Sequence, residues 1–139
     1  MTDQYARIAI VTGATSGIGE ATARAFVAAG FGVVGNGRNA EKLAELEDAL
    51  GSAFCGVAGD AADEGVLENL FAAADDRFGK AVDIVVANAG RGLGGSVTDA
   101  DLGQFEELLN INVTGTLRLL QKAAQKMMPT QEQAYPQSA

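Results

Sequence analysis

The sequence contains no histidine and only one cysteine among its 139 residues. Without histidine, these residues cannot supply an imidazole general base, and most zinc sites are excluded as well. A single cysteine cannot form a disulfide framework within the chain. Cys55 lies in the apolar run Ala53–Ala58, where we predict a small core residue rather than a nucleophile. We therefore predict no metal site.

Long hydrophobic runs and positive charge are also scarce. No apolar stretch approaches the roughly 20 residues that a membrane-spanning helix requires, and Met1–Gln4 lacks the charged-then-apolar pattern of a signal peptide. The net charge of −8 disfavours nucleic acids and anionic membranes as partners, because like charges repel. An acidic surface that keeps the protein soluble is the simpler interpretation. We expect a cytoplasmic protein with no nucleic-acid or membrane partner.

Short β-branched runs alternate with amphipathic or alanine-rich segments along the chain. The predicted strands are Arg7–Thr12, Gly32–Asn36, Ala53–Ala58 and Val82–Ala87. The predicted helices are Ile18–Ala29, Ala40–Leu50, Asp63–Phe78 and Asp101–Met127, the last with Thr98 as its N-cap. Strands that alternate with helices indicate βαβ units around a parallel sheet. The fold class that we predict is α/β, with a doubly wound parallel sheet of the Rossmann type.

A glycine-rich loop, Thr12–Gly19, joins the first predicted strand to the first predicted helix. Gly13 permits a tight turn, Gly17 lets the backbone approach a pyrophosphate, and Gly19 lets helix and strand pack closely. Backbone N–H groups and the helix dipole would then bind the phosphate charge. The loop predicts dinucleotide binding, and a glycine turn without a ligand is the alternative. The predicted cofactor contacts from this loop are Gly13, Thr15, Ser16, Gly17, Ile18 and Gly19.

The glycine spacing, G-x-x-x-G-x-G after a threonine, resembles the short-chain dehydrogenase/reductase family in its shorter-chain branch. Three further motifs match in order. Asp60 follows the third strand, where the family's aspartate contacts adenine. The segment 87–90, Ala-Asn-Ala-Gly, is similar to the family's Asn-Asn-Ala-Gly, with Ala87 in place of the first asparagine. The segment 110–115 resembles the family's helix motif and places Asn112 at its asparagine.

The resemblance covers residues 6 to 128 and assigns roles to matching positions. It implies that Asn112 is catalytic, since the family's asparagine bends its helix and holds a water linked to the catalytic lysine. Simpler interpretations remain open: Asp60 as a surface turn residue, Asn88 as a strand-end cap and Asn112 as a local helix hydrogen bond. The implied cofactor-binding residues are Asp60, Ala61, Asn88, Ala89 and Gly90.

The end of the second predicted strand indicates which cofactor is preferred. A carboxylate there would accept a hydrogen bond from the ribose 2′-hydroxyl of NAD and repel a 2′-phosphate. Gly37 provides no carboxylate, and the guanidinium of Arg38, which follows, is suited to a phosphate. We therefore predict NADP(H), with NAD(H) as the second choice. A solvated Arg38 paired with Glu41 is the alternative.

Two features of the family's catalytic machinery are not found in these residues. The resemblance implies a serine after a fifth strand and a Tyr-x-x-x-Lys pair, but Tyr135 is followed four positions later by Ala139, and Ser138 has no strand before it. We expect residues 1–129 to form a dinucleotide-binding Rossmann half that Pro129 ends, and 130–139 to be a polar loop leading to an absent C-terminal half. The full polypeptide would have roughly 250 residues. The sheet would be incomplete, with four strands of an expected total of about seven.

The functional hypothesis is an NADP(H)-dependent oxidoreductase that interconverts a carbonyl and an alcohol by hydride transfer on a small-molecule substrate. A non-catalytic nucleotide-binding module is the alternative if the chain ends at Ala139. Arg91, in the glycine-rich loop after the fourth strand, is either solvated or meets an anionic substrate. The last helix carries more leucines than one core stripe requires, and the resemblance implies a homo-oligomer, a dimer or tetramer. These leucines are Leu108, Leu109, Leu119 and Leu120.

Overall fold

The structure is a computed structural model, and it describes residues 4–128. The predicted polar segment 130–139, together with Pro129, Tyr135 and Ser138, lies outside the described residues. The strands are β1 (Ile8–Val11), β2 (Gly32–Gly37), β3 (Phe54–Ala58) and β4 (Ile84–Val86). The helices are α1 (Gly17–Ala28), α2 (Ala40–Leu50), α3 (Glu64–Phe78), α4 (Leu102–Leu109) and α5 (Thr116–Met127). In the part of the chain that the structure describes, three short helical turns complete the elements: η1 (Gly51–Ala53), η2 (Val97–Asp99) and η3 (Asn110–Gly115).

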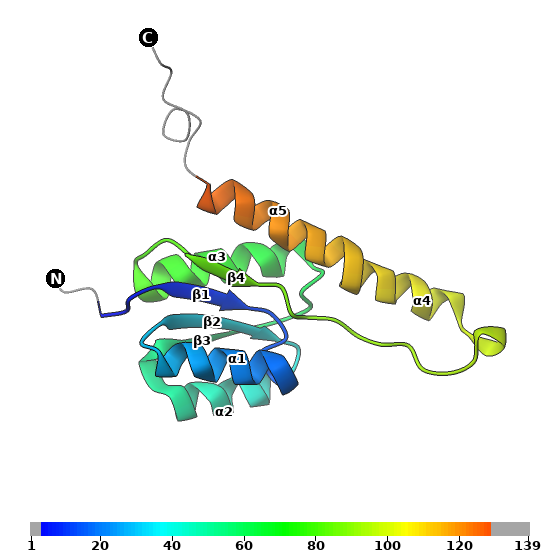
Figure 1. The fold of residues 1–139 in the computed structure, drawn as a ribbon, viewed down its shortest axis with the longest axis horizontal. Helices are drawn as coiled ribbons and strands as arrows, with labels where there is room; N and C mark the ends of the chain where they lie inside the picture. The colour runs from blue at the N-terminus through cyan, green and yellow to red at the C-terminus, as the bar shows by residue number, and fades with distance from the viewer. Residues whose placement is uncertain (1–3, 129–139) are drawn as a thin grey trace, which may run out of the picture.

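The four strands form one parallel sheet in the order β3-β2-β1-β4 (Figure 1). In β1, Ile10 lies opposite Val34 of β2 on one side and Val85 of β4 on the other. The strand order reverses at β1, so its carboxyl end is the switch point where sheets of this kind bind ligands. The predicted fold class is confirmed.

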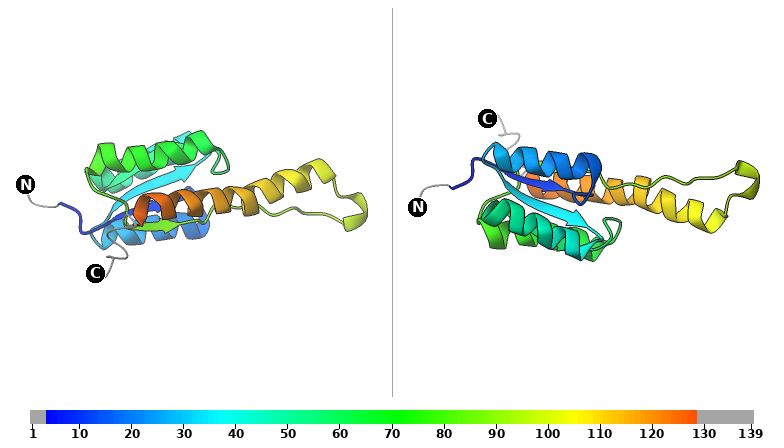
Figure 2. Two further views of the ribbon diagram at one scale, coloured as in Figure 1. Left: turned by 90° about the horizontal axis from the view of Figure 1, so that it is seen from above. Right: turned by 90° about the horizontal axis from the view of Figure 1, so that it is seen from below.

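Helices cover both faces of the sheet (Figures 1 and 2). α1 and α2 lie on one face, and α3 and α5 lie on the other. Successive β1 residues serve two separate cores: Ile8 and Ile10 belong to the cluster with Leu67 and Leu119, whereas Val11 belongs to the cluster on the α1–α2 side. Burial on both faces explains why β1 is continuously apolar in sequence.

The long helix predicted for Asp101–Met127 is helical from Leu102 to Met127, but it is not a regular α-helix throughout. The chain forms α4, then one π-helical turn, η3, and then α5. A π-helical turn inserts an extra residue into the helix and turns the side chains that follow it. The apolar spacing of the sequence does not show this insertion, because each half keeps its own helical period.

The predicted N-cap of this helix is also corrected. Asp101 caps α4, and its Oδ1 accepts hydrogen bonds from the backbone N–H groups of Gly103 and Gln104. Thr98 lies in η2, where its hydroxyl bonds to that of Ser96. The aspartate carboxylate satisfies two of the N–H groups at the helix start, so the helix begins after Asp101.

The edge strands are shorter than predicted. β4 spans Ile84–Val86 rather than Val82–Ala87, and β3 begins at Phe54 because Ala53 belongs to η1. Within residues 4–128, β3 and β4 each have a partner strand on one side only, so each strand ends where its single ladder ends. Before β4, the Asp83 carboxylate instead accepts from the Ile8 N–H at 2.8 Å.

Cys55 lies on the edge strand β3 and is half-buried, so it is less enclosed than a core residue. Burial is the largest cause that raises the pKa of the Cys55 thiol above its ordinary value, and the nearby Arg77 charge opposes it. A raised pKa keeps the thiol protonated and unreactive at neutral pH.

α4 and the loop before it project beyond the sheet (Figures 1 and 2). No residue of α4 is buried, and Leu102 and Phe105 are exposed. Among residues 4–128, no helix has the length and apolar character needed to cross a membrane.

Candidate functional site

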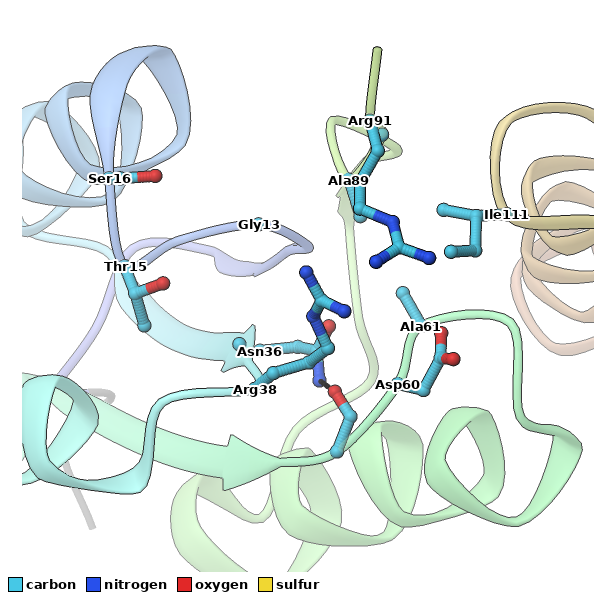
Figure 3. Close-up of a pocket in the computed structure, with 13 residues that line it drawn as sticks. Gly13, Thr15, Ser16, Asn36, Arg38, Asp60, Ala61, Ala89, Arg91 and Ile111 are labelled. Carbon is cyan, nitrogen blue, oxygen red and sulfur yellow. Dashed lines mark hydrogen bonds between the residues drawn. The ribbon is translucent and has the colours of Figure 1, made fainter. Parts of the chain in front are cut away.

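A pocket opens at the carboxyl end of the sheet, at the switch point (Figure 3). Five segments contribute to it: the glycine loop, the end of β2, the turn after β3, the loop after β4 and the π-helical turn η3. The residues that line it are Gly13, Thr15, Ser16, Asn36, Gly37, Arg38, Gly59, Asp60, Ala61, Ala89, Gly90, Arg91 and Ile111.

Most of the residues predicted to bind a cofactor meet in this pocket, although they come from four separate segments. The predicted residues that line it are Gly13, Thr15, Ser16, Arg38, Asp60, Ala61, Ala89 and Gly90. Four predicted residues do not line it: Gly17, Ile18, Gly19 and Asn88. Their surroundings explain what each does instead.

The glycines of the loop are required for different reasons. Gly19 packs closely, since a Cβ there would lie 1.9 Å from the carbonyl oxygen of Gly13. Gly13 and Gly17 both have positive φ, at 64° and 53°, a conformation that favours glycine. Nothing lies within 4 Å of a Cβ built on Gly17, so the loop faces open space there. Ile18, which follows, is 77% exposed.

Asn88 ties the end of β4 to the glycine loop. Its Nδ2 donates to the carbonyl oxygens of Thr12 and Gly13, at 3.2 and 3.3 Å. The buried hydroxyl of Thr12 accepts from the backbone N–H groups of Asn88 and Ala89, both at 3.0 Å. These bonds hold the two sides of the switch point together, which is the strand-end role that the sequence left open for Asn88.

Asn36 was missed by the sequence analysis. Its side chain is buried in β2, and its Nδ2 donates to the carbonyl oxygens of Val57 and Gly59, at 3.0 and 3.1 Å. The backbone carbonyl of Asn36 accepts from the Ala14 N–H at 2.8 Å. Asn36 therefore joins the glycine loop to the turn after β3. The one signal in the sequence is a polar amide inside an otherwise apolar and glycine-rich strand.

Arg38 follows β2 and points into the pocket in Figure 3. The alternative pairing with Glu41 is not formed, and within residues 4–128 the Arg38 side chain has no hydrogen bond or ion pair. Gly37 beside it has no room for a side chain, since a Cβ would lie 2.4 Å from Cγ2 of Thr15. The pocket thus presents a free guanidinium immediately after the position at which NAD-binding proteins carry a carboxylate.

Asp60 and Ala61 line the pocket on the side away from Thr15 and Ser16 (Figure 3). One carboxylate oxygen of Asp60, Oδ1, accepts from the backbone N–H of Ala62 at 2.8 Å. The Asp60 carbonyl accepts from Asp63 N–H at 3.0 Å. Asp60 therefore closes a tight turn with its own backbone, the arrangement typical of aspartate in turns, and its side chain still lines the pocket.

Asn112 lies in the π-helical turn η3 and lines no part of this pocket. Its Oδ1 accepts from Arg91 N–H at 2.8 Å, and its Nδ2 donates to the Arg91 carbonyl at 2.7 Å. Both amide groups thus fix the loop after β4, rather than bonding within the helix. The Arg91 guanidinium lines the pocket and lies 3.8 Å from Glu107, an exposed and therefore weak pair.

A second, apolar groove lies between the loop after β4 and α4. Arg91 and Asn112 line it together with apolar side chains, so the two residues stand where the groove meets the first pocket. These apolar residues include Leu93, Val97, Leu102, Phe105 and Leu108.

The family model described as short chain dehydrogenase matches residues 7–135. The chain belongs to the short-chain dehydrogenase family. The predicted resemblance is confirmed, and this match spans every motif that carried it, from the glycine loop to Asn112.

Individual relatives agree with this assignment. Serine 3-dehydrogenase of Agrobacterium fabrum is 44% identical over 111 residues, which are 79% of this chain and 44% of that protein. A probable NADP-dependent dehydrogenase of Haemophilus influenzae is 37% identical over 112 residues, 80% of this chain and 44% of that protein. The chain therefore spans less than half the length of these relatives.

The fold is shared with solved structures of the same family. A 3-ketoacyl-(acyl-carrier-protein) reductase from Brucella melitensis, complexed with NADH, is similar with a TM-score of 0.82 and 31% identity. The similarity covers 88% of this chain and 50% of that chain.

Proposed function

We propose that this chain supplies the cofactor-binding part of an NADP(H)-dependent oxidoreductase that interconverts a carbonyl and an alcohol. The observation that carries the proposal is the free guanidinium of Arg38 in the pocket, next to Gly37, where no carboxylate fits.

The start of α1 suits a pyrophosphate. Its N-cap residue, Ser16, makes no side-chain cap hydrogen bond, so the first N–H groups of α1 have no side-chain acceptor at Ser16. In contrast, the starts of α2, α3 and α4 are capped by side chains, those of Asn39, Asp63 and Asp101. Uncapped N–H groups at a helix start attract anions, and Gly17 leaves the space in front of them open.

The adenosine end would lie between Arg38 and Asp60. The guanidinium of Arg38 would pair with the ribose 2′-phosphate, while the Asp60 carboxylate would accept a hydrogen bond from the adenine amino group. When bound, the dinucleotide supplies or accepts the hydride. Asn112 would act by holding the loop that carries Ala89, Gly90 and Arg91 along the pocket.

We infer that the groups that protonate the substrate oxygen lie in the half of the family's length that this chain does not span. The relatives' names, a serine dehydrogenase and a ketoacyl reductase, fit a substrate with an alcohol or ketone group. A homo-oligomer is also proposed. Leu109 and Leu120 are exposed, as expected for a partner-facing stripe, whereas Leu119 is buried in the core of its own chain.

Cofactor titration tests the proposal. The dissociation constants for NADPH and NADH are measured by fluorescence on the wild type and on Arg38→Ala. Loss of a charge-assisted contact predicts that the NADPH constant rises about 10- to 100-fold while the NADH constant changes little. Arg77→Ala is the matched control, since Arg77 lies on α3 and lines no part of the pocket. Equal losses for both cofactors in Arg38→Ala would contradict the proposal.

A further inference from the structure

The turn that carries Asp60 and Ala61 is fastened at both ends by side chains from other elements. Before the turn, Asn36 donates to the Gly59 carbonyl at 3.1 Å. After it, Nη1 of Arg118, on α5, donates to the Ala62 carbonyl at 3.0 Å. The two pocket-lining residues of the turn therefore lie between two anchored carbonyl groups.

α5 reaches this turn because the helix start is pressed against it. A Cβ built on Gly115 would lie 2.9 Å from Cα of Ala62, so only glycine lets the two backbones approach this closely. Arg118 is one helical turn further along the chain. Ala62 itself is buried, and its carbonyl satisfies its hydrogen-bonding need through the guanidinium of Arg118.

The position of Ala62 controls the direction of the Asp60 carboxylate. Oδ1 of Asp60 accepts from Ala62 N–H at 2.8 Å, and Asp63 N–H donates to the Asp60 carbonyl at 3.0 Å. A displacement of Ala62 therefore pulls on the carboxylate directly.

We propose that Arg118 is a positioning residue of the nucleotide site: through Ala62 it holds the Asp60 carboxylate in the pocket. Arg118 itself does not line the pocket. This inference rests on the proposed function, because it needs a nucleotide whose base faces Asp60. The proposal gives α5 a role in holding the nucleotide site in place, although no residue of α5 lines the pocket.

The test compares NADPH with its hypoxanthine analogue, in which a carbonyl oxygen replaces the adenine amino group. The Asp60 carboxylate accepts from an amino group and repels a carbonyl oxygen, so the wild type should bind NADPH about tenfold more tightly. In Arg118→Met most of this preference should be lost, and the NADPH dissociation constant should rise about threefold to tenfold. Arg118→Lys keeps a cationic donor and should retain part of the preference.

Arg77→Met is the matched control, since Nε of Arg77 also donates to a backbone carbonyl, that of Ser52, at 3.4 Å. Ser52 precedes β3, at the end remote from the pocket. A merely structural role would lower the thermal midpoint without altering the ratio of the two constants. In an Asp60→Ala background, Arg118→Met should leave the ratio unchanged.

Either of two results with the variants would overturn the inference alone: an unaltered ratio in Arg118→Met, or a further change of the ratio in the Asp60→Ala background. A wild type that binds NADPH without distinguishing the analogue would also overturn it. A wild type that binds no dinucleotide at all would overturn the proposed function, and the inference with it.

Discussion

Replacing Gly37 by alanine adds a single carbon atom at the end of β2. Its Cβ would lie 2.4 Å from Cγ2, 3.0 Å from Oγ1 and 3.2 Å from Cβ of Thr15, well inside the about 3.5–4.0 Å at which carbon atoms are in contact. Rotation of the Thr15 side chain about χ1 still leaves Cγ2 or Oγ1 close to the new Cβ, so the glycine loop that carries Thr15 must move. The expected cost is about 1–3 kcal/mol of unfolding free energy.

A cost of this size lowers the midpoint of thermal unfolding by about 3–12 °C in a domain of this length. The shift of Thr15 should also weaken NADPH binding, because Thr15 lines the pocket. Both quantities are measured on the same samples, by circular dichroism and by fluorescence titration. The control is Gly94→Ala, since nothing lies within 4 Å of a Cβ at Gly94.

A second substitution, at Thr15, provides the decisive comparison. Thr15→Ala removes the two closest atoms and leaves only the contact at 3.2 Å, so the double variant should recover most of the stability that Gly37→Ala loses. This non-additivity is the signature of a direct contact. If Gly37→Ala is as stable as the wild type, or if the two losses add, the steric reasoning is refuted.

Two further predictions concern other parts of the molecule. A hydrogen bond from Lys122, together with its charge, lowers the pKa of Glu68. The stabilisation that this pair gives the folded protein is present at neutral pH and is lost as the pH falls through the lowered pKa. Thermal midpoints from pH 7 to pH 3 should therefore fall less steeply in Lys122→Met, and parallel curves would contradict this. Because burial raises the pKa of Cys55, its alkylation at pH 7 should be slower than that of an unfolded control peptide; equal rates would refute that.

Local patterns were enough to predict the sheet and the glycine loop. A β-branched strand, a turn with glycines at Gly13, Gly17 and Gly19, and a helix follow one another within about 20 residues. Each choice depends on neighbours in the sequence, and the strands are apolar on both faces because helices cover them. The position of β4 beside β1 is a pairing between segments distant in the sequence, and the structure shows it directly.

Details that depend on distant partners were not predictable. The π-helical turn η3 arises where Asn112 bonds to Arg91, 21 residues away, and where Gly115 meets Ala62. The ends of β4 depend on where its one neighbouring strand ends. A hydropathy pattern contains no information about contacts between residues so far apart in the sequence.

The sequence by itself determined the family, the parallel sheet and the grouping of Gly13, Arg38 and Asp60 around one pocket. Only the tertiary structure decided what Asn36 and Arg118 do, because their partners are backbone carbonyls 21 to 56 residues away. A backbone carbonyl has no residue identity, so a sequence cannot indicate which side chain will satisfy it. Packing brings the donor and the acceptor together, and packing exists only in three dimensions.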